Sequence, residues 1–461
     1  MSRITKLLTI STAVLAPWLV TSPVVAADES LGIVTAITIP GRLIGSFDIS
    51  FVDPTIGLYV LADRTNKGVL MVDTHENTFL GYCGQGQFRG ATGHNDTSGP
   101  DGVLIRASRE IWAGDGDATV KVYDIAGCLG PHVGPKLVIK VGDPVLDKRA
   151  DEMCYDPVDE LVMVANNAAD PPFATIIDAS KFPYSIKKKI VFDKTTLPPN
   201  GATNGIEQCV WSAQTRKFMI TVPGVESPDN GHGIVAQIDP TTFAVTKFAD
   251  LPLTVCDTPQ GLATGPDHSG LVPPPDAPNG IPPEPGDHEA SMLVGCNGNG
   301  STNKSSVILS LDDPGDIQAV VADESGPDEV WFNPGDNHYY LARSNAFGGV
   351  QKIGSIDAFG LTADPSITVG PAGRNAHSIA ADAVTNQIFF PVPASPHFTL
   401  CGQGGGHDLH GCILVLKNGP NDGDDVNGCF ASGTPTQVVD ASGNPVLLRS
   451  TCLVVAPIPP G

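Results

Sequence analysis

A short pattern of apolar and polar positions recurs along most of the chain. In its first copy, an apolar segment that starts near Phe47 is followed by a D-P-T-I-G turn and a second apolar segment over 58–62. After a polar loop comes a third segment, G-V-L-M-V-D, which ends at Asp73. Short apolar runs between turns rich in Gly, Pro, Asn and Asp are typical of buried β-strands. Each copy of the pattern therefore predicts three consecutive strands.

The same order returns six more times. The first strand of each copy starts at a polar residue, and these seven marker residues are Asp48, Asp101, Asp151, Glu207, Gln260, Asp328 and His377. The markers follow one another at about 50 residues, the spacing of four-stranded propeller blades with their loops. Most copies continue into a fourth apolar segment, as at 136–141 and 244–249. We therefore predict an all-β fold, a seven-bladed β-propeller; a six-bladed ring with one stray copy is the alternative.

The seventh copy has no fourth strand of the usual kind. Segment 32–39, G-I-V-T-A-I-T-I, lies before the first marker, in the place that a fourth strand takes in the other copies. We predict that this N-terminal strand completes the last blade, because closing the ring pairs edges that would otherwise invite aggregation. The predicted propeller then spans 27–428, and 429–461 forms a C-terminal tail pinned by a disulfide.

The N-terminus has the pattern of a secretory signal. Arg3 and Lys6 precede a mostly apolar stretch over 7–20, and small residues around Ala26 offer a cleavage point. The apolar stretch is short for a membrane span, and no second stretch follows it. We therefore expect a cleaved signal peptide over 1–26, a secreted or periplasmic protein and no membrane span.

Composition supports the all-β interpretation and an oxidising location. The chain contains 51 Gly and 41 Pro residues, distributed throughout rather than in one linker, and 10 cysteines. An even number of cysteines in an exported protein predicts disulfides, although the connectivity stays open. Candidate pairs are Cys401 with Cys412, Cys429 with Cys452, and Cys256 with Cys296.

The net charge of −23 limits the partners. Such an acidic surface repels phosphate backbones and anionic lipids, so we expect no nucleic-acid partner. Cations and small molecules or extracellular partners are compatible with it, although solubility alone also explains such a charge.

The repeat brings the marker residues together. The first strand of every blade lines the central channel, so the seven markers should form a ring at one mouth, with Glu152 and Glu329 one position further in. Carboxylates this close must either take up protons or surround a cation. A flexible set of oxygens suits Ca²⁺, and the predicted ligands are Asp48, Asp101, Asp151, Glu207 and Asp328. The alternative is that these acids only hydrogen-bond the backbone and join neighbouring blades.

The order of strand, D-P-x-x turn, strand, loop and V-x-V-x-D resembles that of exported propellers with YVTN, NHL or SMP-30-type repeats, over about 32–417. That group includes lactonases, lyases and proteins without known chemistry. SMP-30-type lactonases hold a divalent ion with Glu, Asn and Asp from the starts of inner strands. By resemblance, N-G-I-E-Q-C-V-W-S would place Asn204 or Glu207 in this role, P-D-E-V-W-F-N would place Asp328 or Glu329, and G-P-D-G-V would place Asp101. Those lactonases have six blades and their full ligand set is not reproduced in order, so the resemblance implies metal binding more than a substrate.

Histidines offer further chemistry. His377 should project into the channel, and nearby carboxylates should raise its pKa and suit it to acid–base work. Other histidines lie in loops, where solvated side chains are the ordinary explanation and Zn²⁺ or Cu²⁺ ligation is the alternative. They are His232, His397, His407 and His410.

Two classes of function follow. The first is a divalent-metal-dependent hydrolase for a lactone or related ester, with His377 or Glu207 as catalytic residues that activate water and the metal stabilising the oxyanion. The second is a non-catalytic binding scaffold for a partner protein or polysaccharide. A redox metalloenzyme with histidine ligands is a further alternative.

Overall fold

The computed structural model describes most of the chain between residues 31 and 419 and two short strands beyond. The described residues are 31–130, 134–226, 232–266, 290–298, 305–343, 351–370, 376–395, 401, 410–419, 436–439 and 445–448. The predicted signal peptide and the pair Cys429 with Cys452 lie outside them.

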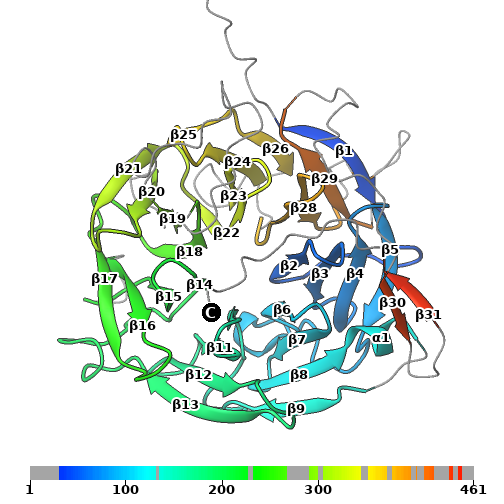
Figure 1. Cartoon of the computed structure of the whole chain (residues 1–461), viewed down its shortest axis with the longest axis horizontal. Helices are drawn as coiled ribbons and strands as arrows, with labels where there is room; N and C mark the ends of the chain where they lie inside the picture. The colour runs from blue at the N-terminus through cyan, green and yellow to red at the C-terminus, as the bar shows by residue number, and fades with distance from the viewer. Residues whose placement is uncertain are drawn as a thin grey trace, which may run out of the picture.

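Seven four-stranded antiparallel blades form a closed ring around a central channel (Figure 1). The prediction of a seven-bladed β-propeller is confirmed, and the six-bladed alternative is wrong. Blade 1 contains β2 (Ser50–Asp53), β3 (Leu58–Asp63), β4 (Gly68–Asp73) and β5 (Thr78–Cys83). Blade 2 contains β6 (Val103–Arg106), β7 (Glu110–Asp115), β8 (Thr119–Asp124) and β9 (Leu137–Lys140). Blade 3 contains β10 (Met153–Asp156), β11 (Leu161–Asn166), β12 (Phe173–Asp178) and β13 (Ser185–Val191).

The next three blades repeat this order. Blade 4 contains β14 (Cys209–Ser212), β15 (Lys217–Val222), β16 (Gly233–Ile238) and β17 (Val245–Leu251). Blade 5 contains β18 (Pro259–Thr264), β19 (Ser291–Cys296), β20 (Ser305–Ser310) and β21 (Ile317–Ala322). Blade 6 contains β22 (Pro327–Asn333), β23 (His338–Arg343) and β24 (Gln351–Asp357), and β24 pairs with both β25 (Thr362–Ala363) and β26 (Ile367–Gly370).

The N-terminal strand closes the ring, as predicted. Blade 7 contains β27 (Ala380–Asp382), β28 (Gln387–Val392), β29 (Cys412–Lys417) and β1 (Gly32–Ile37). β1 pairs antiparallel with β29, from Gly32 opposite Lys417 to Ile37 opposite Ile413. Blade 7 thus combines a strand from the N-terminal part of the chain with three strands from its C-terminal part, and the chain runs from β1 of blade 7 directly into blade 1.

Few other elements occur in the described residues. A 3₁₀ turn, η1 (Asn95–Thr97), precedes blade 2, and one short helix, α1 (Ile125–Cys128), follows β8. A separate pair of strands, β30 (Thr436–Val439) and β31 (Pro445–Leu448), lies in the C-terminal region. In the part of the chain that the structure describes, no helix has the length and hydropathy needed to cross a membrane.

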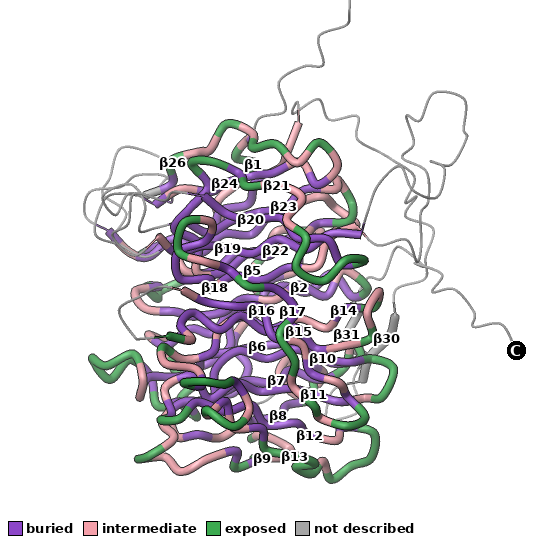
Figure 2. Tube along the Cα trace, turned by 90° about the vertical axis from the view of Figure 1, so that its left-hand side faces the viewer, coloured by how far each residue is buried: buried purple, intermediate pink, exposed green. Residues whose placement is uncertain are grey.

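The hydrophobic core consists of seven clusters, one between each pair of neighbouring blades. The second strand of a blade contributes to two clusters at once: in β3, Leu58 and Val60 face blade 2, whereas Tyr59 and Leu61 face blade 7. Both faces of the middle strands are therefore buried, which explains their almost unbroken apolar sequences. Figure 2 shows this buried interior, with exposed residues concentrated in the connecting loops.

Four disulfides link parts of the ring. Two of the predicted pairs, Cys256–Cys296 and Cys401–Cys412, are confirmed. Two further pairs were not predicted: Cys83–Cys128 joins β5 to α1, and Cys154–Cys209 joins the inner strands of blades 3 and 4.

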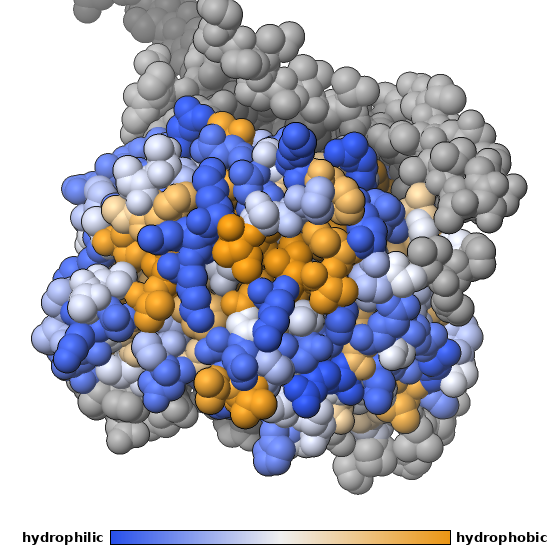
Figure 3. All heavy atoms as spheres, turned by 90° about the horizontal axis from the view of Figure 1, so that it is seen from below, coloured by the Kyte–Doolittle hydropathy of each residue, from blue (hydrophilic) through white to orange (hydrophobic). Residues whose placement is uncertain are grey.

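The outer side of blades 2 and 3 mixes apolar and charged side chains. Figure 3 shows an apolar patch bordered by hydrophilic residues on this side of the ring. Val138 on β9 and Ile186 on β13 are exposed there, and three lysines at 187–189 follow Ile186 along the same strand. Lysines on an outer strand hinder edge-to-edge pairing with another sheet, so this arrangement protects an edge that the ring cannot close.

Candidate functional site

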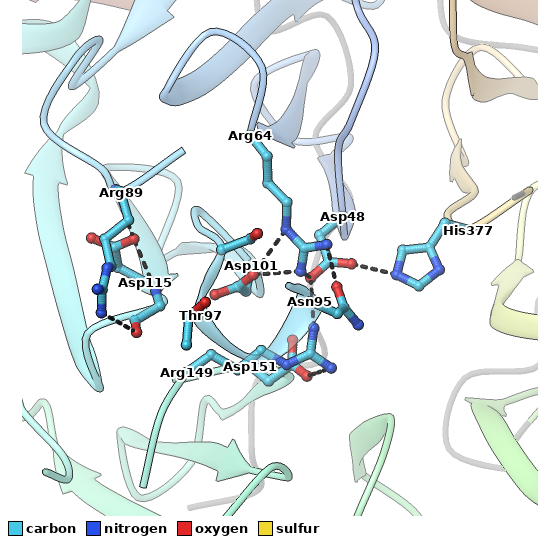
Figure 4. A network of polar contacts seen from close by, with 12 residues as sticks. Asp48, Arg64, Arg89, Asn95, Thr97, Asp101, Asp115, Arg149, Asp151 and His377 are labelled. Atoms are coloured by element: carbon cyan, nitrogen blue, oxygen red, sulfur yellow. Dashed lines mark hydrogen bonds and ion pairs between the residues drawn. The ribbon is translucent and has the colours of Figure 1, made fainter. Parts of the chain in front are cut away.

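The marker residues meet at one mouth of the channel, which we call the upper mouth. Each marker lies at or just before the start of its inner strand, as Asp48 precedes β2 and Asp151 precedes β10. The loop between the second and third strands of a blade reaches the same level, and it brings Arg64 from blade 1 to the centre of the group (Figure 4). Gly102 lets blade 2 approach closely here, because a Cβ on this residue would lie 1.8 Å from the backbone oxygen of Asp151.

Arg64 joins the first two carboxylates of the ring. Its Nε donates to Asp101 Oδ1 at 3.0 Å, its Nη2 pairs with both Asp48 and Asp101, and its Nη1 donates to Asn95 Oδ1 at 2.6 Å. The guanidinium, Asp48 and Asp101 are all buried. A planar group with five donors is suited to bridging two carboxylates in this way.

Arg149 neutralises the next carboxylate. This arginine lies in the loop before β10, and its side chain is 8% exposed. It pairs with Asp151 at 2.7 Å, reaches Asp48 at 3.7 Å and donates to Asn167 Oδ1 at 3.1 Å. Two arginines thus supply positive charge where the sequence had suggested a metal ion or protons. The repeat pattern in the sequence pointed to neither arginine.

His377 lies between two carboxylates from opposite sides. One ring nitrogen pairs with Asp48 and the other with Asp328. Burial alone would lower the pKa of His377, but the negative charges of Asp328 and Asp48 outweigh burial and raise the pKa well above its ordinary value. The ring is therefore an imidazolium that donates on both sides. In this arrangement it has no lone pair with which to accept a proton from water.

The carboxyl groups differ in their ionisation. Burial tends to raise the pKa of Asp48, but Arg64, His377 and Arg149 together hold it below its usual range. Burial dominates at Asp151 and raises its pKa to about 6, even beside Arg149. The asymmetry arises because Asp48 contacts three cations, whereas Asp151 contacts one.

Glu207 is the ring acid that no arginine or histidine pairs with directly among the described residues, although the charge of Arg149 acts on it at longer range. Its polar contact is with the amide nitrogen of Asn167, at 3.4 Å. Burial raises its pKa well above the usual value, and the charges of Asp328 and Asp151 add to the effect. Burial and the neighbouring negative charges thus favour the neutral form of the Glu207 carboxyl. Gln260, the neutral marker, contacts the side chain of Asn297.

A second pair of acids lies one position deeper in the channel. Glu152 and Glu329 are buried and hydrogen-bond each other. Burial raises the pKa of Glu152 to about 8, and the charge of Asp151 adds to this shift. Burial, followed by the neighbouring Glu152, raises the pKa of Glu329 well above its usual value. Two carboxyl groups in contact hold a proton between them because they cannot both ionise.

A cup of about 620 Å³ opens above the ring. Its polar lining comes from blades 7 and 1 and from the loop before blade 2, and its apolar lining includes Phe47 and Pro393. The polar side chains in this lining are Ser46, Arg64, His94, Asn95, Ser98 and His377. Of the cup residues, His94 and Asn95 are exposed, whereas Arg64 is anchored from below. The cup therefore combines a guanidinium and an imidazolium that are held in place with exposed, adaptable polar side chains.

The predicted calcium site is only partly compatible with these contacts. One carboxylate oxygen each from Asp48, Asp101 and Asp151 lie within 4.8 Å of one another, close enough to share an ion. Calcium, however, takes about six to eight oxygens, and the two guanidinium groups already contact these same carboxylates. The residues as arranged do not leave a free set of oxygens for the ion, so we derive no chemical step through it.

The loop histidines lie away from the marker ring. His232 pairs with Glu226 at 2.8 Å and with Asp250 at 3.4 Å at the outer side of blade 4. His410 is exposed just before β29, and His397 and His407 lie outside the described residues. The structure therefore brings His377, alone of the described histidines named above, into the channel.

Comparison with known proteins supports the fold alone. No family model matches the chain, and no curated protein matches it. A chain in the solved structure described as "Crystal Structure of Mitotic Checkpoint Complex" matches with a TM-score of 0.55 and 10% sequence identity, covering 88% of this chain and 100% of that one. At this identity the match shows a shared propeller architecture. The resemblance to YVTN, NHL or SMP-30-type repeats stays a prediction.

Proposed function

We propose that the protein is an exported β-propeller that binds an uncharged, polyhydroxylated ligand, such as the end of a saccharide chain, in the cup above its channel. One observation carries the proposal: the lining of the cup includes a guanidinium and an imidazolium group that buried carboxylates hold in place. Side chains fixed before the ligand arrives lose little conformational freedom on binding, which favours affinity.

The charges around the cup favour a neutral ligand. Arg64 is compensated by Asp48 and Asp101, and His377 by Asp48 and Asp328, so neither cation is available as a free charge for an anion. The net charge of −23 also repels anions at long range. Hydroxyl groups can instead exchange hydrogen bonds with Asn95, His94 and the serines, while Phe47 and Pro393 offer apolar surface to the carbon skeleton.

Export is supported by the disulfides. Four pairs lie within the described structure, and structural disulfides persist in oxidising compartments. Together with the signal-like N-terminus, they favour a periplasmic or secreted protein that meets its ligand outside the cytoplasm.

The test is titration calorimetry of the full chain against a panel of neutral oligosaccharides and polyols. We expect one class to bind with a single site per chain. The double substitution His94→Ala and Asn95→Ala should weaken that binding about tenfold or more, because it removes hydrogen bonds of about 1 kcal/mol each without touching the carboxylates.

Lys188→Ala, on the outer strand β13, is the matched control and should bind like the unchanged protein. Thermal unfolding of each variant checks that the fold is intact. Absence of binding across the panel, or binding that survives the double substitution unchanged, would overturn the proposal.

A second candidate is a divalent-metal-dependent hydrolase for a lactone or related ester. It is favoured by the proximity of the Asp48, Asp101 and Asp151 oxygens, although an ion there would have to displace a guanidinium. Elemental analysis of chain purified without chelator tests it. One equivalent of calcium together with ester turnover that chelation abolishes would support this candidate, copper or iron would favour the redox alternative, and metal-free protein would remove both.

A further inference from the structure

The opposite end of the channel holds a second cavity, with a different chemistry. It has a volume of about 360 Å³ and is lined by the inner strands β2, β6, β10, β14, β18 and β22. These strands start at the marker ring and run away from it, so the cavity opens at what we call the lower mouth. The upper cup and the lower cavity share no lining residue.

The walls of the lower cavity are apolar and rich in aromatic rings. Phe51 and Trp331 meet edge to face with ring centroids 5.4 Å apart. Tyr155 and Trp211 face the same space, and all four rings are partly exposed, so they are accessible from the mouth. Aromatic faces carry negative electrostatic potential, which attracts cations as well as apolar groups.

The closed end of the cavity is acidic. Glu152 and Glu329 line it and hydrogen-bond each other, and their residues are 6% and 4% exposed. The other large polar side chain at this level, Gln208, is satisfied by the backbone: it donates to Val330 O at 3.1 Å and accepts from the backbone nitrogen of Leu262 at 2.6 Å. The two carboxyl groups are therefore the ionisable groups that a ligand would meet at the end of the cavity.

The neighbouring cations are already paired. Arg64, Arg149 and His377 contact the carboxylates of the marker ring above. Arg106 lies over the ring of Tyr155 at 5.7 Å, but it pairs with Glu110 and Glu160. The acidic end of the cavity thus lacks a cation of its own among the residues that the structure describes.

We propose that the lower cavity binds a small hydrophobic amine, with its ammonium group between Glu152 and Glu329 and its apolar body against Phe51 and Trp331. An ammonium group offers three donors and one positive charge, so it can take the place of the proton that the two carboxyl groups share in the free protein. The aromatic walls add cation–π attraction and apolar contact. The negative charge of the whole chain concentrates cations near the mouth. This site is separate from the upper cup and does not depend on the function proposed for that cup.

The experiment compares three probes of similar shape: 2-phenylethylamine, 2-phenylethanol and 3-phenylpropionate. Binding to the full chain is followed by calorimetry and by tryptophan fluorescence, because two of the four tryptophans, Trp211 and Trp331, line the cavity. We expect the amine to bind at least tenfold more tightly than the alcohol, and the carboxylate to be the weakest of the three.

Substitutions then locate the site. Glu329→Gln keeps the shape of the side chain and removes its ability to ionise beside an amine, so it should weaken amine binding at least tenfold and leave the weak binding of the alcohol unchanged. Phe51→Leu reduces the aromatic wall and should weaken both probes. Asn95→Ala, in the upper cup, should alter neither.

Circular dichroism of each variant confirms that it is folded, and Glu152→Gln replaces Glu329→Gln if the latter fails to fold. Equal affinity for amine and alcohol, or amine binding that persists unchanged in the folded Glu-to-Gln variant, would overturn the proposal. Saccharide binding at the upper cup is measured separately with the same variants, so failure of either proposal is distinguishable from failure of the other.

Discussion

Replacing Arg149 tests whether the acidic ring is held together by buried ion pairs. Arg149→Met keeps a long apolar side chain but removes the guanidinium, which is 2.7 Å from Asp151, 3.7 Å from Asp48 and hydrogen-bonded to Asn167. The carboxylates left behind are 3% and 1% exposed, so water cannot readily replace the lost partner. Removing one member of a buried pair lowers the free energy of unfolding by about 3–5 kcal/mol.

The loss should depend on pH in a definite direction. In the folded protein the pKa of Asp151 is about 6, above the ordinary value of 3.8. The folded state thus binds more protons between these values, and stability falls as pH rises through that window. Without Arg149 the folded pKa moves still higher, which extends the window upward. The difference in stability between the unchanged protein and Arg149→Met should therefore be larger at pH 8 than at pH 5.

Urea unfolding followed by tryptophan fluorescence measures this difference at about pH 5, 6.5 and 8, which lie below, near and above the folded pKa of Asp151. Arg89→Met is the matched control, because Arg89 is exposed and its guanidinium contacts only the backbone oxygen of Gly116 in the contacts described. A surface change of this kind should alter stability by about 0.5 kcal/mol or less. Equal losses in the two variants, or a larger loss at pH 5 than at pH 8, would refute the reasoning.

Three further predictions follow from the same structure. The pKa of Glu152 is about 8 in the folded protein against an ordinary 4.5, so the free energy of unfolding should fall as pH rises through this range. Glu152→Gln should flatten that part of the profile of urea midpoint against pH, and it should be more stable than the unchanged protein at high pH. The double substitution Cys154→Ala and Cys209→Ala opens the link between blades 3 and 4 and should lower the free energy of unfolding by about 2–4 kcal/mol, measured without reductant. Deleting Gly32–Ile37 exposes the edge of β29 and should produce oligomers or aggregates visible by light scattering, whereas a ring that stays monomeric without β1 would contradict the closure.

The architecture was predictable because the fold repeats itself. Every middle strand packs against two neighbouring blades, so segments such as Leu58–Asp63 and Leu161–Asn166 are buried throughout and stand out as apolar runs. Seven copies that each pack against two neighbours form a closed ring. The missing fourth strand of the last copy indicated that the N-terminal segment, β1, completes it. These signals lie within short segments and recur in each copy, so they can be recognised without knowledge of side-chain contacts.

The acidic half of the site was predictable for the same reason, but its cationic half was not. The marker residues occupy equivalent places in equivalent strands, so their level in the ring follows from the repeat. Arg64 and Arg149 come from two different kinds of loop, the first between second and third strands and the second between blades, and no repeated position marks them. The Cys154–Cys209 disulfide did have a signal, because both cysteines follow the marker residues of consecutive copies by two or three positions.

The cationic side chains are unevenly distributed around the marker ring, so a ligand in the cup and a divalent ion would occupy different parts of the upper mouth. Arg64, Arg149 and His377 all contact acids of blades 1, 2, 3 or 6, and the cup lies over the side of the ring that Arg64 and His377 occupy. Glu207 of blade 4 has an amide as its polar partner and no direct pair with an arginine or histidine among the described residues, so an added cation could contact it without displacing one. If a divalent ion binds at this mouth, Glu207→Gln should abolish its uptake in metal titrations while stability changes little. Asp101→Asn should instead lower stability, because it breaks the buried pair with Arg64. Metal uptake that is lost in Asp101→Asn but unaffected in Glu207→Gln would show that an ion displaces the guanidinium groups, and would place the cation among the three aspartates rather than beside Glu207.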